Sequence, residues 1–288
     1  MDIEFHYYMT YLIAARAGFT PGEAAIIAQS AQEIDDNHIP IRVSAGTPYA
    51  YDSLISQTMD ILHPHHNLKI YPIFHFIPGD PDSPGAQRKD GRRSPWVTTP
   101  DSALANTMLD TALRSGDLYR IGASAHAFAD TWAHQNFLGI ADVYNRMPPN
   151  SISDWLKDAW PRMWIGHALA GHLPDIPGLI WTDARLSEPV VDNTDRFMAA
   201  AGKLFRKLAH YRNPSASGED DVASLERDLR ADIGASRRLT AQLSKRRIAR
   251  YRARALTEAY GATPMPRYRV GRWADRAFKE QRADLLPS

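Results

Sequence analysis

The sequence predicts an all-α protein: a multi-helix single domain with one long irregular loop and a basic helical extension at its C-terminus. Three observations predict this class. Apolar residues recur at helical spacing along most of the chain, strand-like stretches are scarce, and a high density of proline and glycine breaks the pattern between about residues 37 and 100. With 288 residues, the chain is long enough to bury one core of ordinary size.

Two helices are expected to open the chain. The first covers residues 5–17, where apolar positions follow helical spacing. The sequence TPGE at residues 20–23 then supplies an N-cap, a first-turn proline and an early acid for a second helix, which runs to about Asp35. In the irregular loop that follows, NLKIYPIFHFIP at residues 67–78 is the best candidate for a strand, although its prolines count against it.

The rest of the chain is again expected to be helical. Residues 115–117, Ser-Gly-Asp, separate two helices, and the prolines of LPDIPG end a third. We divide the chain into a helical core, residues 1–185, and C-terminal helices, residues 186–288, that pack on it. The helices after the long loop are expected at residues 101–115, 117–138, 151–172, 190–211 and 220–258.

The overall composition excludes several classes of protein. There are 34 basic and 33 acidic side chains, so the net charge of +1 gives no argument for a nucleic-acid partner of the whole chain. No cysteine is present, which excludes disulfides, thiolate nucleophiles and cysteine-bound metals. The first residues lack the pattern of a secretory signal, and no stretch is long and apolar enough to span a bilayer. We therefore expect a cytoplasmic protein with no transmembrane segment.

One stretch, HAFADTWAHQ at residues 126–135, places three ionisable side chains on an otherwise apolar helix. His126, Asp130 and His134 follow one another at four-residue steps, which puts them along one stripe of a helix. Burying a carboxylate and two imidazoles without partners would cost several kcal/mol, so a compensating group is expected. A divalent cation would compensate them; a hydrogen-bonded Asp and His network without metal is the alternative.

Other histidines and acids stand where they could complete a metal site. His6 lies at the start of the first helix, and His75 stands between two phenylalanines, where an imidazole without a bonding partner is unfavourable. The three histidines of HPHHN, residues 63–66, are expected in a solvated loop. The further candidates are Asp35 and Asp36 in EIDDN, and His167, His172 and Asp175 in IGHALAGHLPD.

The order of these residues resembles that of the ligands in a known superfamily. His, Asp, His, His-x-x-x-Asp, His, His is the order in the zinc-dependent phospholipase C and single-strand nuclease superfamily, all-α enzymes that hold three zinc ions and hydrolyse phosphate esters. DIEFHYYMTYLIAARAGFTPGEAAIIAQSAQEIDDN, HAFADTWAHQ and IGHALAGHLPD resemble more closely a bacterial family of uncharacterised function. This closer resemblance covers roughly residues 1–185.

The superfamily resemblance implies a role for each candidate. Asp130 would be the aspartate that bridges two zinc ions, and His134 would stand about two residues earlier than the matching histidine usually does. Four residues after His167, the expected acid is replaced by Gly171, so that His172 or Asp175 must take its place or one metal position is lost. In chain order, the implied ligands are His6, Asp36 or Asp35, His75, His126, Asp130, His134, His167, and His172 or Asp175.

The N-terminus is a further departure from the superfamily. In its secreted members, a terminal tryptophan exposed by signal removal gives its amine and carbonyl to a zinc ion. This chain starts at Met1, and Asp2 or Glu4 could replace that contribution. We therefore expect two or three divalent metal ions, with zinc as the expected metal.

Such a centre implies hydrolysis of a phosphate ester, a diester rather than a monoester. A metal lowers the pKa of its water to about 7, and two metals about 3.5 to 4 Å apart can hold the attacking and leaving oxygens. Asp35 or Asp36, whichever does not ligate, would be the general base. The substrate would be a small-molecule, lipid or nucleotide phosphate ester.

The predicted C-terminal helix is strongly basic. Between Ile233 and Thr257 there are eight basic residues and no acid, which makes residues 237–254 a candidate surface for an anionic partner such as nucleic acid or anionic lipid. The alternative is a solvated face that pairs with acids of neighbouring helices. The basic residues are Arg237, Arg238, Lys245, Arg246, Arg247, Arg250, Arg252 and Arg254.

Two other kinds of function use the same residue types. A di-iron oxygenase expects Glu-x-x-His pairs and an HD-type phosphohydrolase expects an adjacent His-Asp pair; the sequence contains neither. A non-enzymatic binding or effector module would hold structural metals in a closed site with no position for water.

Overall fold

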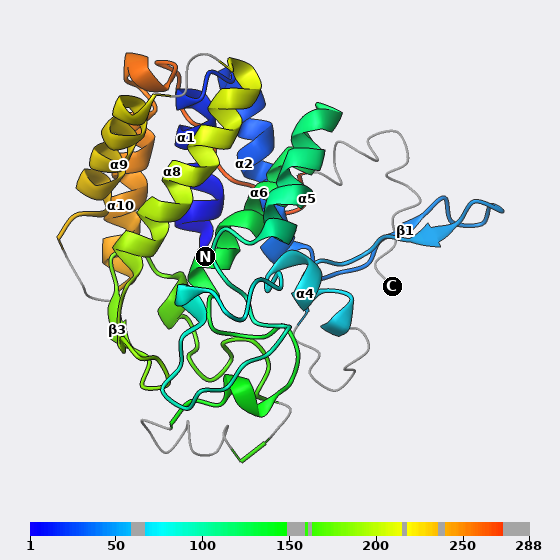
Figure 1. Cartoon of the computed structure of the whole chain (residues 1–288). Coiled ribbons are helices and arrows are strands. Elements are labelled where there is room, and N and C mark those ends of the chain that lie inside the picture. Colours follow the sequence, from blue (N-terminus) through cyan, green and yellow to red (C-terminus); the bar gives the residue numbers. More distant parts are fainter. Residues whose placement is uncertain (59–66, 149–158, 161–162, 215–217, 236–239, 273–288) are drawn as a thin grey trace.

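The computed structural model describes residues 1–58, 67–148, 159–160, 163–214, 218–235 and 240–272 of the chain. Over these residues, the protein is mostly helical, with two small sheets of two strands each. The long helices gather in one half of the molecule, and long loops fill much of the other half (Figure 1). The predicted all-α class is confirmed only roughly, because of the two sheets.

The two N-terminal helices form where they were predicted. The first is a π-helix, η1 (Glu4–Met9), that continues directly into α1 (Thr10–Arg16). Helix α2 (Pro21–Asp36) begins at a capping box, in which the Thr20 side chain accepts from the backbone of Glu23 and the Glu23 side chain accepts from the backbone of Thr20. These reciprocal bonds satisfy helix-terminal donors and fix the start of α2.

Helices α5 (Ala103–Ser115) and α6 (Leu118–Ala133) form an antiparallel pair. Gly116, in the left-handed conformation with φ of 67°, ends α5, and the side chain of Asp117 caps α6. Helix α6 ends at Ala133 rather than at the predicted residue 138, so that His134 is its C-cap. Helix α6 packs against α2, α5 and α8.

The C-terminal region contains three long helices rather than the two that were predicted. Helix α8 (Asn193–Arg212) agrees with prediction, but residues 220–258 do not form one helix. They contain α9 (Glu219–Ile233) and α10 (Ala241–Arg254), followed by a short 3-10 helix, η6 (Glu258–Tyr260). Gly234, with φ of 76°, ends α9, because a left-handed residue cannot continue the helix. In the described parts of the chain, no helix is both long and apolar enough to cross a bilayer.

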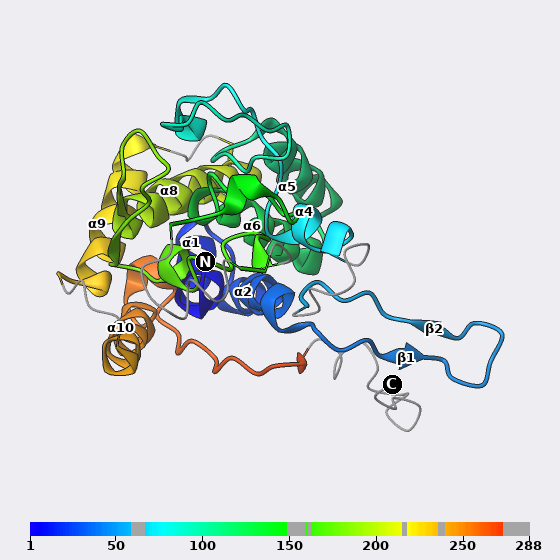
Figure 2. The same ribbon diagram turned by 90° about the horizontal axis from the view of Figure 1, so that it is seen from below.

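The long loop contains short elements that the sequence did not predict. Strands β1 (Arg42–Val43) and β2 (Tyr51–Asp52) pair in an antiparallel hairpin that projects from the body of the molecule (Figure 2). The predicted strand at residues 67–78 is wrong: this segment contains the short helix α4 (Tyr71–Phe74), which has proline in its first turn. A 3-10 turn, η2 (Pro84–Ala86), follows.

The helix predicted at residues 151–172 is not formed over its described part. Residues 166–172 form turns, and η5 (Leu173–Asp175) follows them, while residues 151–158 and 161–162 lie outside the described residues. Gly166 and Gly171 have φ values of 52° and 58°, which end any helix there. The remaining elements are η3 (Val143–Asn145) and the antiparallel strands β3 (Ile180–Thr182) and β4 (Val190–Asp192).

One hydrophobic core joins the N-terminal and C-terminal helices. Phe5 of η1 packs edge to face on Phe197 of α8, with ring centroids 5.5 Å apart. Phe128 of α6 and Tyr251 of α10 are fully buried in the same cluster. Residues after 186 therefore complete the core around η1 and α6.

Gly122 lies at the closest approach of α6 to α2. A Cβ at this position would lie 2.3 Å from the carbonyl oxygen of Ile27 and 2.7 Å from the Cβ of Ser30. We expect Gly122→Ala to lower the free energy of unfolding by about 1–3 kcal/mol, because the two helices must separate. Gly22→Ala is the control: its Cβ meets nothing within 4 Å, so stability should be unchanged or slightly higher. Urea unfolding followed by circular dichroism measures both, and equal stabilities would contradict this packing.

Candidate metal centre

Eight of the predicted ligands converge, from segments far apart in the sequence. One of them lies on η1, one at the end of α2 and one directly after α4. Three lie on α6 and its C-cap, and two lie in the turns around η5. They form three groups whose potential ligand atoms lie within 4.8 Å of one another. The groups are His6, His126 and Asp130; Asp35, His75 and His126; and His134, His167 and Asp175.

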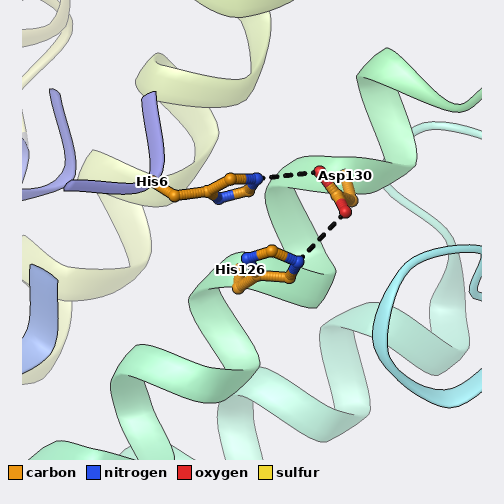
Figure 3. A group of neighbouring side chains, drawn as sticks. All are labelled: His6, His126 and Asp130. Atoms are coloured by element: carbon orange, nitrogen blue, oxygen red, sulfur yellow. Dashed lines mark hydrogen bonds and ion pairs between the residues drawn. The ribbon is translucent and has the colours of Figure 1, made fainter. Parts of the chain in front are cut away.

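The Asp130 carboxylate contacts both imidazoles of the first group, His6 and His126 (Figure 3). Its Oδ1 is 3.1 Å from Nε2 of His6, and its Oδ2 is 3.2 Å from Nε2 of His126. The same Oδ2 is 3.3 Å from Nδ1 of His75. Because its two oxygens face different imidazoles, the carboxylate has the placement of a bridge between two cation positions.

Asp35, at the end of α2, is placed beside the imidazoles in a similar way to Asp130. Its Oδ2 is 4.0 Å from Nε2 of His6, and its Oδ1 is 3.8 Å from both Nδ1 of His75 and Nε2 of His126. Both carboxylates therefore approach His6 with one oxygen and the pair of His75 and His126 with the other, while the rings of His6 and His126 stack with centroids 3.8 Å apart. This donor set of imidazoles and carboxylates suits divalent metal ions.

The spacing of the ligand atoms also fits a metal ion. Nδ1 of His75 and Nε2 of His126 are 3.2 Å apart. Tetrahedral zinc with bonds of about 2.0–2.1 Å separates neighbouring ligand atoms by about 3.3 Å. The two imidazoles and the nearby Asp130 oxygen thus have separations that one ion can span.

The third group lies at the C-terminal end of α6. Nε2 of His134 is 3.0 Å from Oδ1 of Asp175, and Nε2 of His167 is 3.4 Å from Oδ2 of Asp175. The two imidazole nitrogens are 3.2 Å apart. The ring of Phe76 stacks on His134, with centroids 4.6 Å apart, and holds this imidazole in place.

Backbone carbonyls orient three of the imidazoles. Nε2 of His75 lies 2.8 Å from the carbonyl oxygen of Ser56, and Nδ1 of His134 lies 2.7 Å from the carbonyl oxygen of His75. Nδ1 of His167 lies 2.8 Å from the carbonyl oxygen of Gly171. When a neutral imidazole donates to such a carbonyl, its other nitrogen keeps a lone pair for a metal. In each case, that other nitrogen faces the carboxylates.

The amino group of Met1 lies inside the centre, although the sequence had suggested Asp2 or Glu4 in place of a terminal amine. It contacts Oδ1 of Asp130 and lies 3.3 Å from Oδ1 of Asp175. Burial opposes its charge, but Asp130 and Asp175 outweigh burial and raise its pKa to about 11. A positive charge therefore balances part of the buried negative charge.

The buried imidazoles differ in their pKa shifts: burial opposes the charge of His75, but Asp130 and Asp35 outweigh burial and raise its pKa. Burial lowers the pKa of both His6 and His134, so they are neutral at neutral pH. Burial raises the pKa of Asp35. Burial would also raise that of Asp175, but His167 and the amino group of Met1 hold it far below the usual range of a carboxyl.

Two predicted candidates do not join any group among the described residues. The carboxylate of Asp36 accepts from the Tyr268 hydroxyl at 2.5 Å and from Nε2 of Gln32 at 3.1 Å. His172 is exposed, and Asp175 is the residue that lies beside His167. Of the alternatives left open by the sequence, the structure thus brings Asp35 and Asp175 into the centre.

Asp2 and Glu4 do not take the place of the missing terminal tryptophan. Asp2 accepts from the backbone N–H of Glu4, and Glu4 forms an ion pair with Arg247. The histidines of residues 63–66 lie outside the described residues.

The centre reaches solvent at two of its edges. The side chains of His6 and His126 are fully buried, whereas those of Asp35 and His167 are 24% and 19% exposed. The centre is therefore closed at His6 and His126 and open to water at Asp35 and His167.

Comparison with known proteins gives one match. The family described as Family of unknown function (DUF6765) matches residues 1–287, and so extends beyond residues 1–185, which carry the resemblance to a family of uncharacterised function. No curated protein and no solved structure matches the chain. Because the match includes both the candidate ligands and the C-terminal helices, the chain belongs over nearly its whole length to this family of unknown function.

Proposed function

We propose that the protein is a metal-dependent hydrolase of phosphate esters that holds two or three divalent ions, with zinc as the expected metal. The observation that carries the proposal is the position of Asp130, whose two oxygens face His6 on one side and His75 and His126 on the other. Bound ions at such a bridge would activate water and stabilise the charge that develops at phosphorus.

The residues of the chain have separate tasks in this proposal. Asp130 is buried and serves as the bridging ligand. Asp35 is partly exposed beside the same imidazoles and is placed to ligate and to accept a proton from the attacking water. His134, His167 and Asp175 offer the third position. The order of these residues resembles that of the phospholipase C and nuclease superfamily, which supports a phosphate ester as the substrate class.

Metal analysis combined with two generic substrates tests the proposal. We expect the purified protein to carry at least one equivalent of zinc, manganese or iron by elemental mass spectrometry. It should hydrolyse bis(p-nitrophenyl) phosphate faster than p-nitrophenyl phosphate, lose this activity with a chelator and recover it with added zinc. Chelation should also lower the melting temperature, because metal binding to the folded state contributes to stability. Less than one equivalent after reconstitution would refute the metal centre.

A second candidate function is supported by the complete burial of His6, His126 and Asp130. Closed metal sites are usually structural, which suits a binding or effector module. That module would carry tightly held metal and lack activity on either substrate. Turnover of the diester that depends on added metal would exclude it.

A further inference from the structure

The basic residues of α10 divide into an exposed set and an internally bonded set. Lys245, Arg246, Arg250 and Arg252 are exposed, although Arg250 also makes an internal bond, while Arg237 and Arg238 lie outside the described residues. The internally bonded set consists of Arg247, which pairs with Glu4, Arg254, which pairs with Asp232, and Arg250, which donates to the carbonyl of Asp232. Two of the charges that the sequence offered to an anionic partner, those of Arg247 and Arg254, are therefore paired with carboxylates of the protein itself.

The Arg247 pair is the most deeply buried of these contacts. Arg247 is 3% exposed and Glu4 is fully buried. Nε and Nη2 of Arg247 donate to the two carboxylate oxygens of Glu4, both at 2.7 Å. Because two parallel hydrogen bonds join the guanidinium and the carboxylate, this contact fixes the orientation of the Glu4 side chain as well as its distance from Arg247.

A second contact one turn along reinforces the first. Tyr251, four residues after Arg247, stacks on Tyr8, four residues after Glu4, with ring centroids 6.3 Å apart. Helix α10 thus holds η1 at two points along the same face; Figure 2 shows α10 close to the N-terminal helices. The turn that α10 holds is the one that carries His6.

The same turn carries three contacts to the metal centre. Nε2 of His6 faces Asp130, the amino group of Met1 contacts Asp130 and Asp175, and the backbone N–H of Asp2 donates to the carbonyl of Asp175 at 3.1 Å. Glu4 lies between these groups in the sequence. A movement of Glu4 would therefore move His6 and Met1 relative to Asp130.

We propose that Arg247 is a positioning residue of the metal centre, which holds Glu4 so that His6 and the first residues stay in register with Asp130. This inference rests on the proposed metal centre. Without Arg247, Glu4 would be a buried carboxylate without its cation, two residues from His6. An unpaired buried carboxylate rotates toward water or another cation. This rotation would displace the first turn of η1.

Substitution of two arginines on the same helix tests the proposal. Zinc affinity is measured by competition with a chromophoric chelator in the full-length wild type, Arg247→Met and Arg254→Met. We expect Arg247→Met to weaken the affinity about 10- to 100-fold, as loss of a group that orients a ligand does. Arg254→Met breaks an ion pair with Asp232 away from η1 and should keep the wild-type affinity even if the melting temperature falls.

A second readout does not depend on metal. Amide hydrogen exchange of residues 5–9 should be faster in Arg247→Met and unchanged in Arg254→Met. Arg247→Lys keeps the charge but loses the two-point contact, so its affinity should lie between those of wild type and Arg247→Met. This milder variant also replaces Arg247→Met if the latter does not fold.

The possible failures can be told apart. If the wild type binds less than one equivalent of zinc, the metal centre is refuted, whereas faster exchange in Arg247→Met would still support the contact between α10 and η1. If the wild type binds zinc and Arg247→Met keeps its affinity, the metal centre stands and the positioning role is overturned. Equal loss of affinity in Arg247→Met and Arg254→Met would also overturn it.

Discussion

Asp130→Asn is expected to remove at least one metal ion and to lower phosphodiester hydrolysis by roughly three orders of magnitude. The two Asp130 oxygens face His6 on one side and His75 and His126 on the other. An amide of the same shape offers only one good ligand oxygen and no charge. A metal supplies several kcal/mol of transition-state stabilisation, and about 4 kcal/mol corresponds to roughly a thousandfold in rate. Elemental mass spectrometry and steady-state kinetics measure the two effects.

Asp110→Asn is the matched control for this substitution. Asp110 of α5 forms a surface ion pair with Lys207 of α8, outside the three groups of candidate ligands. Exposed ion pairs contribute about 0–1 kcal/mol, so metal content and rate should stay near those of the wild type. If Asp130→Asn keeps both its metals and its rate, the bridging role of Asp130 is wrong.

Substitution of the adjacent carboxylates Asp35 and Asp36 is expected to give very different results. Asp35→Asn should lower metal affinity and reduce the diester rate about 100-fold or more, because Asp35 lies beside three of the imidazoles and reaches solvent. Asp36→Asn should change the rate less than about twofold, since it alters only the contacts to Tyr268 and Gln32, worth roughly 1–3 kcal/mol of stability.

Each variant is compared for metal content, kcat and melting temperature. The expected pattern is loss of metal and rate in Asp35→Asn and, at most, a lower melting temperature in Asp36→Asn. The reverse pattern would assign the ligand to Asp36 and would show that the end of α2 is rotated relative to its position in this structure.

The sequence predicted those elements whose signals are local. The capping box at Thr20, the left-handed Gly116 and the Asp117 cap are formed by residues within a few positions of one another, so α2, α5 and α6 begin or end close to the expected places. The step from His126 to Asp130 likewise depends only on the helical repeat. These features do not need the rest of the fold.

The wrong predictions came from segments whose conformation depends on distant contacts. The apolar pattern of residues 151–172 suggested a helix, but Gly166 and Gly171 are left-handed, and a Cβ at Gly166 would lie 2.4 Å from the ring of Phe76. Phe76 packs on His134 and His167, so the turn serves the third group of ligands. Residues 67–78 were predicted as a strand, but they contain α4 and place His75 directly after it. The local sequence gives no sign of this conformation.

By itself, the sequence determined the helical class, most of the helices and six of the eight converging candidate ligands, because helix caps and helical spacing are short-range properties of the chain. Only the tertiary structure decided between Asp35 and Asp36 and between His172 and Asp175. Neighbouring residues point in different directions, and the packing of α2 on α6 and of the η5 turn on His134 selects which one faces the centre. The tertiary structure was also needed to show the contacts of the Ser56 and Gly171 carbonyls, of the Met1 amino group, and of Arg247 with Glu4. Each of these contacts joins atoms that no local sequence pattern connects.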